Sequence, residues 1–202
     1  MTKQHPDSQV LDPRWSDLRQ YRDMPEIDFD RLYAYRVERL RAQMRQRGIG
    51  LTMLVNPVSM RYAAEYRTYA LFQSHIPTTY VFVPADGPLV INAAYGATDV
   101  VKDVRPGRPL HYFDGGEDLT DLAAALAGDI CEFLAEIGDT TNRVAVEYVN
   151  PSITRALVDR GLDVVDGVLV SEAARGIKNP DEVNCIQWAC AIGRIAALNT
   201  VA

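Results

Sequence analysis

The chain has 202 residues, of which 48% are hydrophobic and 24% charged, and its formal net charge at pH 7 is −6. This composition is typical of a folded globular protein and excludes a largely disordered chain. The negative charge argues against a general nucleic-acid-binding protein, because phosphate-backbone binding needs clustered cations. No apolar run approaches the ~18 residues of a membrane span, so we expect neither nucleic acid nor a membrane as a partner.

The cysteines and the N-terminus bear on location. Cys131, Cys185 and Cys190 are an odd number without metal-ligand spacing, which fits reduced thiols in a cytoplasm better than a disulfide framework. No apolar segment follows Lys3, so no secretory signal is recognisable. We therefore expect a cytoplasmic protein.

The first third of the chain predicts an arm, a helix and a strand. Residues 1–28 contain three prolines and few apolar anchors, which predicts an extended N-terminal arm, with a disordered tail as an equally good interpretation. From Asp28 to Gly48, apolar residues recur every three or four positions, which predicts an amphipathic helix with caps at both ends. Residues 51–55 are an apolar run typical of a buried strand.

The middle of the chain predicts a hairpin and two shorter elements. Residues 79–83 and 88–92 are β-rich runs on either side of an Asp-Gly turn, which is a hairpin signal. A short helix over 97–103 and a strand over 110–113 are predicted to follow.

The second half alternates between helices and strands. Helices are predicted over 122–137 and 152–160, and strands over 144–147 and 162–165. This alternation implies an α/β fold with a mixed or partly parallel sheet covered by helices.

The last segment has a strong helix start. Asn179 stands at the N-cap, Pro180 in the first turn, and Glu182 can reach back to the cap. The apolar face of this helix ends in small residues that call for a close partner. The helix runs to Ala202 without a stop signal, so we interpret the chain as ending inside an element.

No metal or nucleophile motif is recognisable, and no catalytic residue is assigned. The three histidines lie far apart and outside ligand-like contexts, so no metal is expected on this chain. No Gly-x-Ser-x-Gly elbow is present. Glu147 and either Asp163 or Asp166 follow predicted strands and could converge as a catalytic pair, although strand-end carboxylates are also common in plain structure.

The segment from 56 to 75 is the richest in side chains that bind ligands. Loops of this kind often line binding sites, with arginine pairing a carboxylate and aromatic rings forming an apolar wall. A helix and loop whose tyrosines only cover the sheet is an equally good interpretation. The candidate pocket residues are Arg61, Tyr66, Arg67, Tyr69, Phe72 and His75.

Several of these motifs together resemble a known family. They are Asn56-Pro57 and Met60-Arg61-Tyr62 after the first strand, the Ala85-Asp86-Gly87 turn, and a closing run of the form Arg-x-Ile-Lys-x-x-x-Glu from Arg175 to Glu182. Over residues 29–202 the sequence resembles the N-terminal domain of the creatinase, prolidase and aminopeptidase P family, the pita-bread metallohydrolases. Within it, the sequence looks most like the dimethylsulfoniopropionate lyase branch.

The resemblance implies a fold and a division of labour. The fold would be a mixed, mostly six-stranded sheet flanked by helices, like ribonuclease H, over 29–178. Residues 179–202 would be the first helix of a catalytic domain that is otherwise absent. The two divalent metal ions of the family would be held there, so this chain would carry no cofactor.

The function implied by the resemblance is that of a non-catalytic N-terminal domain. It would contribute homodimer contacts and pocket walls to a dimetal Xaa-Pro peptidase or creatinase-like hydrolase acting on a peptide or small molecule, or alternatively to a dimethylsulfoniopropionate lyase. Two other hypotheses come from the residues alone. One is a self-sufficient enzyme using carboxylates such as Glu147, Asp163 and Asp166, and the other is a stand-alone binding or oligomerisation module whose last helix is completed by another chain.

Overall fold

The computed structural model describes residues 25–68, 70–93, 98 and 100–201. They fall into two compact units, one of residues 33–177 and one that joins residues 25–32 to residues 178–201. We describe each unit by itself.

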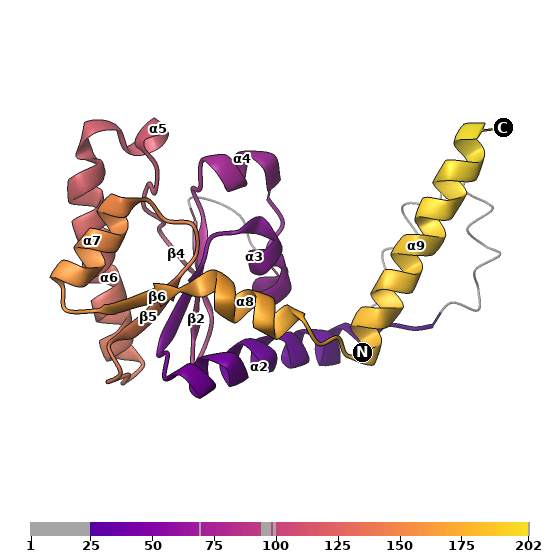
Figure 1. Ribbon diagram of the computed structural model, residues 1–202, viewed down its shortest axis with the longest axis horizontal. Coiled ribbons are helices and arrows are strands. Elements are labelled where there is room, and N and C mark those ends of the chain that lie inside the picture. The colour runs from indigo at the N-terminus through magenta and orange to yellow at the C-terminus, as the bar shows by residue number, and fades with distance from the viewer. Residues whose placement is uncertain (1–24, 69, 94–97, 99, 202) are drawn as a thin grey trace. The chain divides into compact units, whose positions relative to one another are not determined.

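The larger unit is built on one six-stranded sheet (Figure 1). Its spatial order is β4-β3-β2-β1-β5-β6. The strands in chain order are β1 (Leu51–Leu54), β2 (Tyr80–Pro84), β3 (Val90–Asn92), β4 (Asp103–Arg105), β5 (Arg143–Val146) and β6 (Asp163–Asp166). The β1–β2 and β2–β3 pairs are antiparallel, whereas β3–β4, β1–β5 and β5–β6 are parallel. The predicted α/β fold with a mixed sheet is confirmed.

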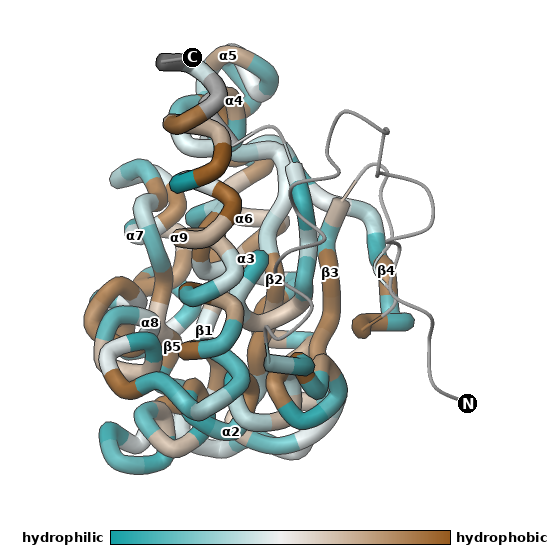
Figure 2. The backbone as a smooth tube through the Cα atoms, turned by 90° about the vertical axis from the view of Figure 1, so that its right-hand side faces the viewer, coloured by the Kyte–Doolittle hydropathy of each residue, from teal (hydrophilic) through white to brown (hydrophobic). Residues whose placement is uncertain are grey.

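Helices cover both faces of the sheet. The helical elements of the described residues are α2 (Phe29–Arg47), α3 (Pro57–Ala64), α4 (Ala70–His75), α5 (Tyr112–Gly115), the 3-10 turn η2 (Gly116–Asp118), α6 (Leu119–Glu136), α7 (Pro151–Asp159), α8 (Gly167–Arg175) and α9 (Pro180–Val201). Figure 1 places α6 and α7 on one side of the strands and α3 and α8 on the other. In Figure 2, β3 is mostly hydrophobic and α2 mostly hydrophilic.

The core is split by the sheet into two layers. Leu51 and Met53 of β1 pack with Leu126 of α6 in one cluster, and Leu54 packs with Leu40 of α2 in the other. Alternate residues of a strand point to opposite faces, so one apolar strand supplies both layers. This explains why β1 is buried along its whole length and reads as a continuous apolar run.

Most predicted elements are confirmed, with ends shifted by a few residues. These are the first helix, the strand at 51–55, the hairpin around Gly87, and the four alternating elements between 122 and 165. In the N-terminal arm, residues 1–24 lie outside the described residues. No helix in the described part of the chain has the length and hydropathy needed to cross a membrane.

Two predicted elements are wrong. In the helix expected over 97–103, residues 97 and 99 lie outside the described residues, residues 98 and 100–102 are irregular, and Asp103 begins β4. Parallel pairing of β4 with β3 overrides the local preference there. The strand expected over 110–113 is instead the cap and start of α5, because His111 Nδ1 accepts a hydrogen bond from the Phe113 amide at 3.1 Å.

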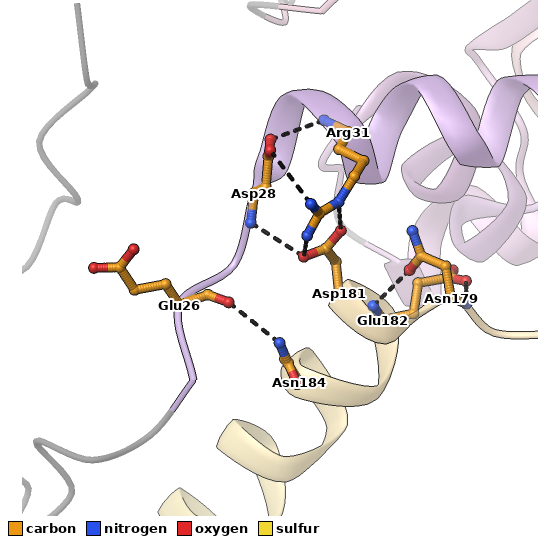
Figure 3. Close-up of polar contacts among 7 residues, drawn as sticks. All are labelled: Glu26, Asp28, Arg31, Asn179, Asp181, Glu182 and Asn184. Atoms are coloured by element: carbon orange, nitrogen blue, oxygen red, sulfur yellow. Dashed lines mark hydrogen bonds and ion pairs between the residues drawn. The ribbon is translucent and has the colours of Figure 1, made fainter.

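In the smaller unit, the predicted N-terminal cap of α9 is confirmed (Figure 3). Asn179 Oδ1 accepts from the Glu182 amide at 2.8 Å, and Glu182 Oε2 accepts from the Asn179 amide at 3.2 Å. The two residues therefore form a reciprocal capping box.

The segment before α2 lies along one face of α9 (Figure 3). Asn184 donates to the Glu26 carbonyl at 3.2 Å, and the Trp188 indole donates to the Pro25 carbonyl at 3.0 Å. Asp181 accepts two bonds from the Arg31 guanidinium, at 2.7 and 2.8 Å. Positions 181, 184 and 188 share one helix face, so side chains of that face tie residues 25–31 to α9.

This contact is expected to fail in acid. The hydrogen bond from Arg31 holds the pKa of Asp181 below its usual range, so the contact is at full strength above about pH 4, the usual value for an unfolded Asp, and weakens as the pH falls through the lower folded pKa. In a Trp15→Phe background, Trp188 emission should stay constant above pH 5 and shift to longer wavelength in stronger acid. Asp181→Asn should abolish that dependence on pH. An unchanged acid transition in Asp181→Asn would assign it to another group.

Candidate functional site

The candidate site lies where β1 and β5 end. The two strands are parallel, so their carboxyl ends meet at the same edge of the sheet. Helix α3 leaves β1 at this edge, and Glu147 follows β5 directly. Asn56 starts α3, because its Oδ1 accepts from the Val58 amide at 2.8 Å, and Pro57 occupies the first helical position.

Glu147 is a buried acid with hydrogen bonds to separate elements. The residue is 1% exposed, and Oε2 accepts from the amides of Val55 and Asn56, each at 3.0 Å. Oε1 accepts from the Ser171 hydroxyl of α8 at 2.7 Å, and Ser59 of α3 also hydrogen-bonds to the carboxylate. Burial raises the pKa of Glu147, and these hydrogen bonds partly offset the rise.

The structure does not assemble the carboxylate pair considered from the sequence. Asp163 lies opposite Arg143 at the amino ends of β6 and β5, four residues or roughly 13 Å along the strand from Glu147. Asp166 lies at the carboxyl end of β6, on the same edge of the sheet as Glu147, but its Oδ1 accepts from the Val168 amide and caps α8. Glu147 itself is satisfied by amides and hydroxyls, so its arrangement is that of a structural carboxylate.

Two of the predicted pocket residues meet on one acid. Arg67 donates to Glu65 Oε1 through Nε at 3.1 Å and Nη2 at 2.7 Å, and Arg61 Nε lies 3.9 Å from the same oxygen. The side chains of Arg61 and Arg67 are 61% and 71% exposed, whereas that of Glu65 is 17% exposed. Glu65 therefore holds two guanidinium groups at the surface, and the pair remains open to an anionic ligand.

The backbone at Glu65 is unusual. This residue caps the C-terminus of α3 in the left-handed conformation, with φ 50°, which is uncommon for a residue other than glycine. Tyr33 of α2 also hydrogen-bonds to Glu65, and burial together with this carboxylate raises the pKa of Tyr33 to about 12. Tyr33 and Glu65 thus fix the point at which the chain turns from Arg61 to Arg67, and sequence periodicity assigned neither of them to the site.

Three other predicted pocket residues have surroundings of their own. Tyr66 is buried in the core cluster beside α2 and α3. Phe72 is exposed and makes an edge-to-face contact with Phe113 of α5, with ring centroids 6.4 Å apart. His75 is exposed beside Ser74. Tyr69 lies outside the described residues.

Further exposed aromatic residues were missed from the sequence. Tyr148 follows Glu147 with φ 41° and is 64% exposed. Tyr112 and Phe113 of α5 are also exposed. A positive φ at a residue other than glycine, as at Tyr148, cannot be recognised in the sequence. The exposure of Tyr112 and Phe113 was missed because a strand was wrongly predicted over 110–113.

Within the described ranges, no group of three or more His, Cys, Asp or Glu side chains could hold a metal ion. The described side chains that can contact an anionic ligand at this site are the exposed guanidinium groups of Arg61 and Arg67, and Glu147 supports the backbone beneath.

Comparison with known proteins identifies the family. Residues 36–174, more than half of the chain, match the creatinase/prolidase N-terminal domain family, and the chain belongs to that family. The resemblance seen in the sequence is thus confirmed, and with it the fold class.

Two curated relatives are similar over most of the chain. The dimethylsulfoniopropionate lyase DddP of Roseovarius nubinhibens is 31% identical over 172 residues, which cover 81% of this chain and 39% of the relative. The enzyme of the same name from Roseobacter denitrificans is 29% identical over 179 residues, covering 84% and 40%. The chain thus spans about two fifths of the length of these relatives.

A solved structure shows a further likeness. The dipeptidase PepE from Mycobacterium ulcerans is 21% identical, with a TM-score of 0.49, and the match covers 85% of this chain and 44% of that one.

Proposed function

We propose that this chain is the non-catalytic N-terminal domain of a dimetal pita-bread enzyme. In this proposal, the chain supplies pocket walls and homodimer contacts. The two divalent metal ions belong to the catalytic domain, which residues 179–202 begin. The family and the two-fifths coverage of the curated relatives support this division of labour.

The observation that supports a role in the substrate pocket is the pair of arginines, Arg61 and Arg67, beside Glu65. Two exposed guanidinium groups on one short segment are suited to a carboxylate, which they can bind through several charge-assisted hydrogen bonds. The neighbouring Glu65 would orient the arginines while leaving part of each guanidinium free. We therefore infer that the substrate carries a carboxylate.

Two candidate classes of substrate carry a carboxylate. Both curated relatives are dimethylsulfoniopropionate lyases, which favours a small propionate with a sulfonium group as the substrate of the parent enzyme. The prolidase in the family name supports the second candidate, an Xaa-Pro peptide, whose C-terminus is also a carboxylate.

Binding to the chain tests the arginine pair. Dimethylsulfoniopropionate and Gly-Pro should each shift amide signals of residues 61–68 in a two-dimensional NMR titration, with a Kd of about 1 mM or weaker. Trimethylsulfonium, which lacks the carboxylate, should not. The double variant Arg61→Gln/Arg67→Gln should weaken binding by about tenfold or more, because each charge-assisted bond is lost.

A matched control separates this effect from a general change in charge. Arg45 and Arg47 lie in the last turn of α2, where Arg45 pairs with Glu38 and Arg47 donates to Gln43, so the double variant Arg45→Gln/Arg47→Gln removes the same two charges from another helix. Its binding should equal that of the unsubstituted chain. Equal binding by the double variant, or equal shifts with trimethylsulfonium, would reject a carboxylate site at this pair.

The division of labour has its own test. The chain alone should neither consume dimethylsulfoniopropionate nor cleave Gly-Pro, with or without added divalent metal, and light scattering should measure twice the mass of one chain. Turnover that survives a chelator would contradict a non-catalytic domain and revive the self-sufficient enzyme. A monomer at high concentration would contradict the homodimer contacts.

A further inference from the structure

We propose that Glu147 is a positioning residue, whose carboxylate ties the start of helix α3 to helix α8 and so fixes the position of the Arg61 and Arg67 pair. The consequence for ligand binding rests on the proposed function. The contact itself is a property of the chain and can be tested without any ligand.

Glu147 joins segments that are far apart in the sequence. Its partners Val55 and Asn56 lie about 90 residues earlier, and Ser171 lies 24 residues later. Val55 and Asn56 form the link between β1 and α3, where the sheet ladder has ended. The carboxylate thus supplies the acceptors that secondary structure does not provide at this junction.

The negative charge of the Glu147 carboxylate suits the hydrogen-bond donors around it. Two amides and two serine hydroxyls hydrogen-bond to the side chain, and an ionised carboxylate offers about four acceptor positions. A glutamine offers one acceptor oxygen and must turn its NH2 toward the serines. Ser171 can adapt to this, because its hydroxyl also lies 3.2 Å from the Val168 carbonyl and can donate there instead. A methionine fills a similar volume, but its thioether is a very weak hydrogen-bond acceptor.

Helix α3 transmits this position to the arginine pair. The helix is short, and Asn56 both contacts Glu147 through its amide and caps the first turn through Oδ1. On the side of α8, the Tyr62 hydroxyl donates to the Ala174 carbonyl at 3.5 Å, and Arg175 donates to Ser59 at 3.4 Å. With Glu147 in place, α3 is held at its beginning and along its length. Arg61 and Glu65 lie toward the far end of the helix, so their positions depend on the position of α3.

Amide hydrogen exchange on the whole 202-residue chain tests the contact. In Glu147→Met, the protection of the Val55 and Asn56 amides should fall about tenfold to a hundredfold, since a charge-assisted bond is lost at each. Glu147→Gln should restore much of it. The amides of Val81 and Ile91, in the sheet ladder, should change far less. If Glu147→Met does not fold, Ser171→Ala removes one partner and should lower protection at the same two amides by a smaller factor.

Two results would overturn the proposal. One is unchanged protection at Val55 and Asn56 in Glu147→Met or, if that variant does not fold, in Ser171→Ala. The other is an equal loss at Val81 and Ile91, which would make Glu147 a contributor to overall stability and no more. In the NMR titration, Glu147→Met, or Ser171→Ala if that variant does not fold, should bind a carboxylate ligand more weakly than the unsubstituted chain, while Glu147→Gln should lose less affinity and Arg45→Gln none. Equal binding would remove the consequence for the ligand and leave the contact standing. Failure of the arginine variants alone would reject the proposed function and leave the exchange result intact.

Discussion

Gly167→Ala is expected to lower the free energy of unfolding by about 3 kcal/mol, because a side chain at the start of α8 has no room. A Cβ placed on Gly167 would lie 2.8 Å from the Val146 carbonyl carbon and 3.1 Å from the Glu147 amide nitrogen. Both are backbone atoms of the β5 end, so no rotamer change can relieve the clash. Urea denaturation followed by circular dichroism measures the loss.

Gly193→Ala is the matched control for this substitution. Nothing lies within 4 Å of a Cβ at Gly193, which is exposed in the interior of α9. Alanine favours a helix over glycine by about 0.5–1 kcal/mol, so this variant should be as stable as the unsubstituted chain or slightly more so. If Gly167→Ala unfolds at the same urea concentration as Gly193→Ala, α8 does not approach β5 as closely as described.

Phe133→Ala is expected to cost about 4 kcal/mol, because it opens a cavity between α6 and the sheet. The Phe133 ring is 2% exposed and lies 5.3 Å from the Phe82 ring, centroid to centroid. The Arg105 guanidinium lies over the same ring at 5.3 Å, so an edge strand also loses a contact. The midpoint of thermal unfolding should fall accordingly.

The control for Phe133 is the exposed ring of Phe113. Phe113 is 71% exposed, and its ring contact is with Phe72 at the surface. Phe113→Ala should change stability by about 0.5 kcal/mol or less. Similar losses in the two variants would mean that burial does not separate the two rings as the structure has them.

The parts of the fold that could be predicted are those with a strong local signal. The capping box at Asn179 and Glu182 and the turn at Gly87 need only neighbouring residues, and both are confirmed. Helix α8 was missed, because its sequence begins Gly-Val-Leu-Val and reads as extended. The Asp166 cap at its start is a local signal that was overlooked, whereas the close packing of Gly167 against the end of β5 is a tertiary contact. Strand β4 likewise exists because β3 lies beside it.

The site was predicted as a segment but not as an arrangement. Residue types marked 56–75 as able to bind a ligand, and Arg61 and Arg67 do meet at its surface. Which tyrosine is buried depends on how α3 rotates against the sheet, so the sequence did not show that Tyr66 is part of the core cluster. Glu147 was noticed as a strand-end carboxylate, but its role depends on amides about 90 residues away.

The sheet order also sets the sequence in which the chain can fold during synthesis. Strand β1 can pair with β2, and β2 with β3, as soon as residue 92 has left the ribosome, because these three strands form a simple antiparallel meander. Its other edge belongs to β5, which is made some ninety residues after β1. In that interval an apolar strand presents an unpaired edge, the form most open to pairing with another nascent chain. Mutations that slow closure by β5 should therefore lower the soluble yield of the protein more than its final stability.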